Sequence, residues 1–292
     1  MADWIELDER ALRQYIDAKQ TFEAYEAACR QVQSVSGGML WRRSKGHEYL
    51  IQTSKDNRQR SLGRKSAETE AQYAQFTARK RAAQERLRTV RHQMAIHHQL
   101  NRGLRVGHVP ALLVRILAAL ERLGLHDDVL VAGEAALFAY ETQAGVRLCE
   151  PASPASQDGP GRLSLQIWVA SHAVRELAFT ALRAADKSFI ARHVHADGLE
   201  AGNAQGWTVA IRDTTASAAV IASASPLAMS KFSIPVVSET GRMARLTTIP
   251  PCLYVACEIS QAARNDLPPA LRAWHDARAH AVLRLVEMCF PN

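Results

Sequence analysis

The sequence of 292 residues has few cysteines, no long apolar segment and no basic cluster in its first ten residues, and each absence argues against a class of protein. Its five cysteines are an odd number without any Cys-x-x-Cys pair, which argues against a disulfide framework and a zinc knuckle. No apolar run approaches the roughly 18 residues that a membrane span requires. Residues 1–10 are acidic where a signal peptide would be basic. We therefore expect a soluble, bacterial-type cytoplasmic protein without a membrane partner.

Acidic residues are scarce in one segment of the chain. The 36 Lys and Arg against 29 Asp and Glu give a net charge of +7 and a pI near 9.4. Residues 42–105 contain 16 basic and 5 acidic residues, so this segment carries +11 and the remainder carries −4. A concentrated positive charge of this kind predicts a polyanionic partner, RNA or DNA, on the N-terminal part of the chain.

Residues 1–108 predict a helical region that contains a β-hairpin. Apolar positions at helical spacing predict a helix over 7–35, which the glycines 37 and 38 end. Apolar and aromatic runs on either side of Lys45-Gly46 predict a hairpin over 39–51 with a basic tip. A second long, solvated helix is expected over 66–99, begun by an N-cap at Ser66. Because long helices with a thin apolar stripe often find a partner, a homo-oligomer is a further expectation.

Basic side chains gather on the predicted hairpin and at the start of the second helix. The predicted nucleic-acid-binding residues are Arg42, Arg43, Lys45, Arg64 and Lys65. Trp41 and Tyr49 are available beside them for stacking on bases. A charge run of this kind is otherwise typical of a solvated face, so the alternative is a surface without a partner.

Residues 109–292 show a different pattern, in which short apolar runs alternate with helical spacing. Together with the first region this predicts an α+β fold: a helical N-terminal region with a β-hairpin, a mixed sheet flanked by helices, and a C-terminal helical part. Helices are expected over 111–124, 134–142, 171–185, 253–263 and 268–288. Strands are expected over 129–132, 163–169, 207–211, 232–237 and 243–249, with a loop over 151–161.

Five sequence blocks follow one another along the chain and carry a family resemblance. They are Leu40-Trp-Arg with Lys45-Gly-x-Glu-Tyr49, then Ser61-Leu-Gly with Ser66-x-Glu-Thr69, then Gly133-x-x-Ala-Leu-Phe-Ala-Tyr140, then Leu182-Arg-x-x-Asp-x-Ser-Phe189, and finally Asn203-x-x-Gly-Trp207. In this order they resemble a bacterial family of nucleotidyltransferase-fold proteins of the DNA polymerase β superfamily. The resemblance implies a nucleotidyltransferase-like mixed sheet over residues 109–292.

In that superfamily, a glycine followed by serine or threonine opens the triphosphate site, and an Asp-x-Asp pair with a third carboxylate holds two divalent metals. In this sequence those positions fall on Gly133 with Glu134, on Gln166 and Trp168, and on Ala210. An amide, an indole and a methyl group cannot supply the oxygen ligands that Mg²⁺ requires. The resemblance therefore implies a nucleotide-binding cleft at Gly133, Glu134, Gln166 and Trp168, with Trp168 as a base-stacking surface and with neither a catalytic residue nor a metal.

Other side chains leave alternatives open. A lysine that the family carries in a later helix falls near Cys257 and Glu258, so its cation is also replaced. Magnesium is expected only if Asp158, Asp186 or Asp213 rescues the site. His193 and His195 would share one face of a strand and could ligate a metal, although without a nearby Cys or carboxylate the ordinary interpretation is two solvated histidines.

The sequence thus predicts a nucleotidyltransferase-like pseudoenzyme that binds a nucleotide or a nucleic acid. One alternative is an active, divergent nucleotidyltransferase that moves a nucleotide to an unknown acceptor. The other is a non-enzymatic interaction module that binds nucleic acid or protein through its basic N-terminal region.

Overall fold

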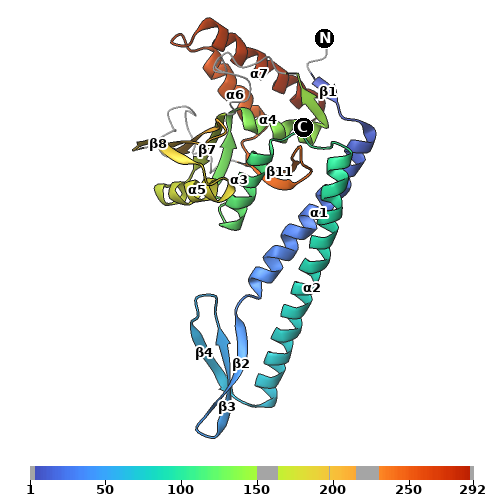
Figure 1. Ribbon diagram of the computed structural model, residues 1–292, viewed down its shortest axis with the longest axis vertical. Helices are drawn as coiled ribbons and strands as arrows, with labels where there is room; N and C mark the ends of the chain where they lie inside the picture. Colours follow the sequence, from blue (N-terminus) through green and yellow to red (C-terminus); the bar gives the residue numbers. More distant parts are fainter. Residues whose placement is uncertain (1–3, 150–163, 197, 215–229, 290–292) are drawn as a thin grey trace. The chain divides into compact units, whose positions relative to one another are not determined.

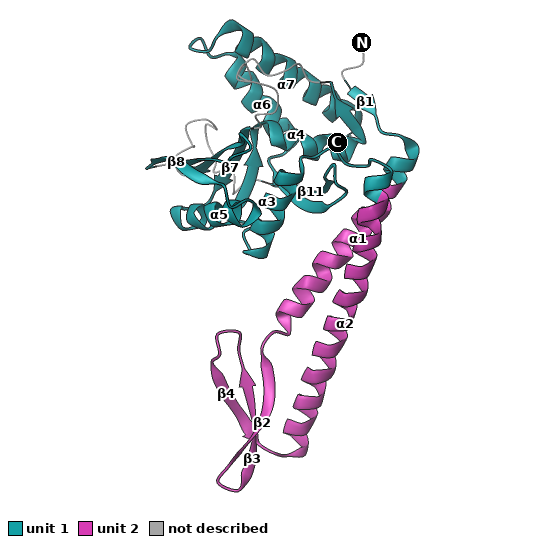
Figure 2. Cartoon of the chain, in the orientation of Figure 1, with its two compact units in different colours: residues 1–13, 101–292 teal, residues 14–100 magenta. Residues whose placement is uncertain are grey.

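The computed structural model of the protein describes residues 4–149, 164–196, 198–214 and 230–289. The chain divides into two compact units, residues 14–100 and residues 1–13 with 101–292 (Figure 2). The sequence placed a domain boundary between residues 108 and 109. The first thirteen residues join the second unit through a short strand pair, in which β1 (Trp4–Glu6) lies antiparallel to β6 (Val146–Leu148).

The unit of residues 14–100 consists of two long helices and a three-stranded antiparallel sheet. Its elements are α1 (Glu9–Ser34), β2 (Gly38–Ser44), β3 (His47–Thr53), β4 (Gln59–Arg64) and α2 (Ala67–Gly103). Lys45 and Gly46 both have positive φ in the two-residue β2–β3 turn, as the hairpin sequence predicts. The Ser66 hydroxyl accepts the Thr69 N–H at 3.3 Å and so caps α2 as expected.

Small buried side chains permit the close packing of this unit. Ala18 and Ala28 of α1 and Ala83 of α2 are fully buried. The His97 ring of α2 contacts two side chains of α1, with 3.0 Å to Gln14 Nε2 and 3.1 Å to Thr21 Oγ1. Both ring nitrogens are therefore engaged between the helices.

A seven-stranded mixed sheet forms the centre of the other unit (Figure 1). Its strand order is β11-β12-β5-β7-β10-β9-β8. The strands are β5 (Val129–Ala132), β7 (Ser164–Val169), β8 (Ile190–His195), β9 (Gly198–Gly202), β10 (Thr208–Asp213), β11 (Phe232–Val237) and β12 (Met243–Thr248). In the middle of the sheet β5 is antiparallel to β7, and β7 is parallel to β10.

Helices flank this sheet, so the predicted α+β fold is confirmed. The helical elements are α3 (Ala111–Arg122), the 3₁₀ turn η1 (Gly133–Ala136), α4 (Leu137–Ala144), α5 (His172–Ala185), α6 (Pro251–Ala262) and α7 (Pro269–Cys289). Helix α5 packs on β7, β9 and β10, and α3 packs on α5 and β12. Helices α6 and α7 pack against each other as the C-terminal helical part.

The remaining differences from the sequence prediction are local. The helix expected from residue 134 begins as the 3₁₀ turn η1, and strands β1, β4, β6 and β9 were not predicted. Strand β8 was indicated only by the spacing of His193 and His195. The loop expected over 151–161 lies outside the described residues. Within the ranges described above, no helix is long and apolar enough to cross a membrane.

Candidate functional site

The middle strands of the mixed sheet bring together the positions that the family resemblance singles out. Along β7, Leu165, Ile167 and Val169 are buried, while Gln166 is exposed and Trp168 is half-buried on the opposite face. Ala210 of β10 lies directly opposite Gln166. We call this side of β7, β10 and β9 the open face, because α5 packs on the other side. The side chains of Gln166, Trp168 and Ala210 thus lie side by side on the open face.

Gly133 joins this group at the end of β5. The antiparallel register pairs Ala132 with Gln166, so Gly133 follows at the same edge of the sheet. Its φ of +66° is favourable for glycine, and a Cβ there would lie 3.3 Å from Gln166 Cδ. The Gln166 amide therefore lies against the Gly133 backbone, where the resemblance implies a metal ligand beside the triphosphate loop.

Glu134 lies next to this contact and faces a buried cation. Its side chain is one-third exposed, and its Oε1 lies 3.6 Å from Arg278 Nη1. The Arg278 guanidinium stacks on Trp274 at 4.2 Å and donates to the Tyr254 hydroxyl at 2.6 Å. No lysine occupies the position near Cys257 and Glu258 where the family resemblance implies one. Arg278 of α7 instead places a cation beside Glu134, which the sequence pattern did not indicate.

Two of the three carboxylates that could rescue a metal site already have partners. Asp213 lies on the α5 side of β10, where Arg175 Nη1 binds its Oδ2 at 3.3 Å. Asp186 accepts the Ser188 N–H at 2.9 Å, the Ser188 hydroxyl at 2.8 Å and the Asn203 amide at 3.0 Å. These bonds, the Ser188 N–H foremost, lower the pKa of Asp186. Asp158 lies outside the described residues.

The two histidines singled out as possible ligands lie on the edge strand β8. The rings of His193 and His195 stack with centroids 6.3 Å apart, and both residues are exposed. Among the residues that the structure describes, no group of three His, Cys, Asp or Glu side chains comes together as a metal site. The described part of the molecule therefore offers no donor set that fits a divalent metal.

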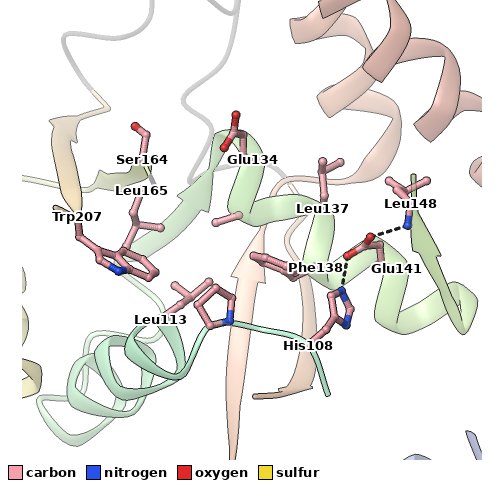
Figure 3. Close-up of a pocket in the computed structure, with 12 residues that line it drawn as sticks. His108, Leu113, Glu134, Leu137, Phe138, Glu141, Leu148, Ser164, Leu165 and Trp207 are labelled. Atoms are coloured by element: carbon pink, nitrogen blue, oxygen red, sulfur yellow. Dashed lines mark hydrogen bonds and ion pairs between the residues drawn. The ribbon is translucent and has the colours of Figure 1, made fainter. Parts of the chain in front are cut away.

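A cavity of about 250 Å³ adjoins α4 in the same unit (Figure 3). Its walls are mainly apolar and include Leu113, Phe138 and Trp207. At one end His108 Nε2 lies 2.8 Å from Glu141 Oε2, and Glu141 Oε1 accepts the Leu148 N–H at 2.7 Å. The contact between His108 and Glu141 holds the segment before α3 against α4. These residues come from separate elements, so no single sequence motif predicts the cavity.

The three-stranded sheet of the other unit has two different faces. On one face Arg42, Tyr49 and Arg64 are directly opposite one another across β2, β3 and β4. Arg42 and Arg64 are exposed and Tyr49 is half-buried. Arg42 Nη2 donates to the Gln59 amide oxygen at 2.7 Å, and Arg64 Nε donates to the Tyr49 hydroxyl at 3.2 Å. We call Arg42, Tyr49 and Arg64 the basic row.

The other predicted nucleic-acid-binding residues do not belong to this row. Arg43 lies on the opposite face of β2, directly across from Glu48. Lys65 binds Glu48 at 2.8 Å and lies 3.7 Å from Glu70, and it lowers the pKa of the exposed Glu48 carboxyl. Lys45 occupies the exposed hairpin turn.

The two aromatic residues predicted for base stacking lie on different faces of the three-stranded sheet. The Trp41 ring packs on Tyr73 of α2 with centroids 5.9 Å apart, and Lys65 Nζ lies 5.6 Å from its centroid. Trp41 thus belongs to the face that covers α2. Tyr49 lies among the cations of the basic row, with Arg64 Cζ 5.9 Å from its ring centroid.

Comparison with known proteins adds no relative: no family model, no curated protein and no solved structure gives a significant match to this chain.

Proposed function

We propose that this protein is a nucleotidyltransferase-like pseudoenzyme that binds nucleic acid through the basic row. The observation that carries the proposal is an aromatic ring flanked by two exposed guanidinium groups on one sheet face. Arg42 and Arg64 hydrogen-bond neutral groups, and no carboxylate of the described residues pairs with either. Their full charge is therefore available to phosphate oxygens, while the Tyr49 ring offers an apolar surface to a base.

The nucleotidyltransferase-like part of the proposal is supported by strand geometry. A strand that ends in Gly133 lies antiparallel to the strand of Gln166 and Trp168, which lies parallel to the strand of Ala210. This arrangement suits a two-metal site, but the side chains lack the carboxylate oxygens that such a site requires. Asp186 and Asp213 support the absence of catalysis because both carboxylates are engaged elsewhere.

The binding proposal is tested with the full chain and a labelled single-stranded RNA. Charge reversal of Arg42 and Arg64 to Glu is expected to abolish binding at moderate salt, because two phosphate contacts become repulsive. The variant Tyr49→Ala is expected to weaken binding about fivefold or more by removing a stacking surface. Unchanged affinity in both variants would exclude the basic row.

The pseudoenzyme proposal needs a separate experiment. Labelled nucleoside triphosphates with Mg²⁺ or Mn²⁺ are incubated with the protein and with tRNA, protein and small-molecule acceptors. We expect no transferred label. Transfer to any acceptor would instead favour the active, divergent enzyme, and its loss in Asp158→Ala would identify the rescuing carboxylate.

Two further aspects of the sequence prediction belong to the same proposal. We place the protein in the cytoplasm, which its five unpaired cysteine thiols support.

A homo-oligomer through the long helices is supported by the exposed apolar side chains of Ile16 on α1 and of Ile96 and Leu100 on α2. Light scattering coupled to size exclusion measures the mass directly, and a monomer of 32.2 kDa at high concentration would exclude the oligomer.

A further inference from the structure

The cavity of about 250 Å³ beside α4 has the features of a ligand site (Figure 3). We call it the α4 cavity. Its lining residues all belong to the unit of residues 1–13 and 101–292, and two of them, Ser164 and Trp207, mark the edge of the sheet where β7 and β10 begin. Its volume lies just below the range of about 300–1,000 Å³ that is typical of drug-sized ligands. A small molecule with a single ring therefore suits it.

The α4 cavity lies on the other side of the mixed sheet from the open face. Its wall includes Leu165 of β7, which is buried on the side that α5 covers. Gln166 and Trp168 lie on the opposite side of the same strand, since side chains alternate along it. Of the four described residues predicted to bind a nucleotide, Glu134 alone lines the cavity. A ligand here does not occupy the face where the family resemblance implies a nucleotide.

Most of the wall is apolar and firmly packed. Leu113, Leu165 and Trp207 are buried, and Phe138 is half-buried. The His108 ring meets the Phe138 ring at 64° with centroids 5.4 Å apart, which fixes the orientation of both rings. These side chains leave space for an apolar body, and the two aromatic rings of Phe138 and Trp207 favour an aromatic one.

The polar end of the cavity offers hydrogen-bond acceptors. The Leu148 N–H is a backbone donor at this end, and Glu141 Oε1 already accepts it at 2.7 Å. His108 Nε2 lies 2.8 Å from Glu141 Oε2, and a neutral imidazole that donates from Nε2 keeps Nδ1 as an acceptor. A carboxylate has lone pairs for about four hydrogen bonds, so Glu141 can accept more than these two. A ligand at this end must therefore bring donors.

The charge of the wall is negative. Glu134 and Glu141 both line the cavity, and the described lining residues include no lysine or arginine. Arg278 of α7 lies 3.6 Å from Glu134 and offsets its charge. The described partners of Glu141 are an imidazole and a backbone N–H. Because the Glu141 side chain is only 8% exposed, water and salt screen its attraction for a cation weakly.

We propose that the α4 cavity binds a small protonated amine with an aromatic body, with the ring against Phe138 and Trp207 and the ammonium group on Glu141. An aromatic carboxylate of the same size is rejected, because it brings a like charge and further acceptors to an end that already consists of acceptors. This goes beyond nucleic-acid binding by the basic row, since it concerns the other unit, a different class of ligand and different residues.

The test is calorimetric titration of the full chain with probes that share a phenyl ring on a short chain: 2-phenylethylamine, 2-phenylethanol and 3-phenylpropionate. The titrations are made at about pH 8, above the ordinary titration range of an imidazole. We expect saturable binding of the amine. Binding of the alcohol should be about tenfold weaker, because a neutral hydrogen bond replaces a charged one. We expect no saturable binding of the carboxylate.

Variants of the wall locate the site. Glu141→Gln removes the charge and keeps the shape of the side chain, so it should weaken binding of the amine about tenfold and leave binding of the alcohol unchanged. Phe138→Ala removes part of the apolar wall and should weaken the binding of both probes. The control Glu176→Gln removes an exposed carboxylate of α5 that does not line the cavity, and it should leave both affinities unchanged.

Three results would overturn the proposal. They are no saturable binding of the amine, binding of 3-phenylpropionate as tight as that of the amine, or an equal effect of Glu141→Gln on the amine and the alcohol. Circular dichroism melting of each variant excludes loss of the fold as the cause, and the comparison of the probes on the wild type decides without any variant. RNA binding should be the same in Glu141→Gln and the wild type, so this proposal and that of the basic row are tested independently.

Discussion

Asp213 ends β10 with its carboxylate on the side of the sheet that α5 covers. Because side chains alternate along a strand, it lies on the opposite face from Ala210 and Arg212. Arg175 and Asp213 are both nearly buried, with 3% and 11% of their side chains exposed. A carboxylate held in this way neutralises an arginine in the core and does not reach the open face.

Removal of this carboxylate should leave Arg175 buried without its ion partner. We expect Asp213→Ala to lower the free energy of unfolding by about 3–5 kcal/mol. The control Asp276→Ala removes an aspartate whose side chain is 59% exposed and should change the value by less than about 1 kcal/mol. Urea unfolding followed by circular dichroism measures the free energy of unfolding of both variants. Equal losses in the two variants would contradict the buried ion pair of Arg175 and Asp213.

Asp186 should make stability depend on pH in the acid range. Its folded-state pKa lies below the ordinary value because Ser188 and Asn203 donate to the carboxylate. The stabilisation is therefore complete above the unfolded-state pKa and is lost as the pH falls through the lowered folded-state pKa. We expect the wild type to be more stable than Asp186→Asn at neutral pH and the difference to shrink in acid. A difference that stays constant with pH would contradict this role.

At the scale of elements, the strands with an apolar pattern could be predicted and the polar ones could not. The run Val129–Ala132 is buried at every position, and β7 alternates strictly, so both were found from the sequence. Strand β8 is exposed at all six residues, so only the spacing of its two histidines indicated a strand. Strand β4 contains basic and small residues without alternation. Hydrogen bonding to a neighbouring strand forms these elements, and that information is not present in local hydrophobicity.

The residues of the candidate sites could also be predicted only in part from the sequence. Gly133, Gln166, Trp168 and Ala210 could be brought together in advance because the family resemblance orders their strands. The basic row of Arg42, Tyr49 and Arg64 could not be singled out in advance, since β4 and its register with β3 were not predicted.

The burial of one alanine of α2 gives a prediction at this scale. Ala83 is fully buried, whereas the neighbouring Ala82 is exposed. We expect Ala83→Leu to lower the free energy of unfolding by about 1–3 kcal/mol, because the larger side chain overfills a packed position. Ala82→Leu adds the same atoms on the solvent side and should change the value by less than about 0.5 kcal/mol. Thermal or urea unfolding of the two variants measures both changes, and similar losses would contradict the packing at Ala83.

At the scale of the whole molecule, the net charge belongs to one unit. Residues 14–100 contain 16 basic and 8 acidic residues and carry +8, while the rest of the chain carries −1. The unit with the mixed sheet is therefore nearly neutral. This division supports the proposal that a polyanion binds to the unit of residues 14–100.

Binding through the basic row is tested by the salt dependence of RNA binding in two variants at neighbouring positions. Arg42 and Arg43 are adjacent on β2, carry the same charge and lie on opposite faces of the sheet. Fluorescence anisotropy with a labelled single-stranded RNA is recorded between about 50 and 200 mM salt, and log K is plotted against log salt concentration. We predict that Arg42→Gln reduces the magnitude of the slope by about 0.7, the value of one phosphate contact on a single strand, and that Arg43→Gln leaves the slope unchanged. Equal slopes in Arg42→Gln and the wild type, or equal reductions in both variants, would contradict binding through the basic row.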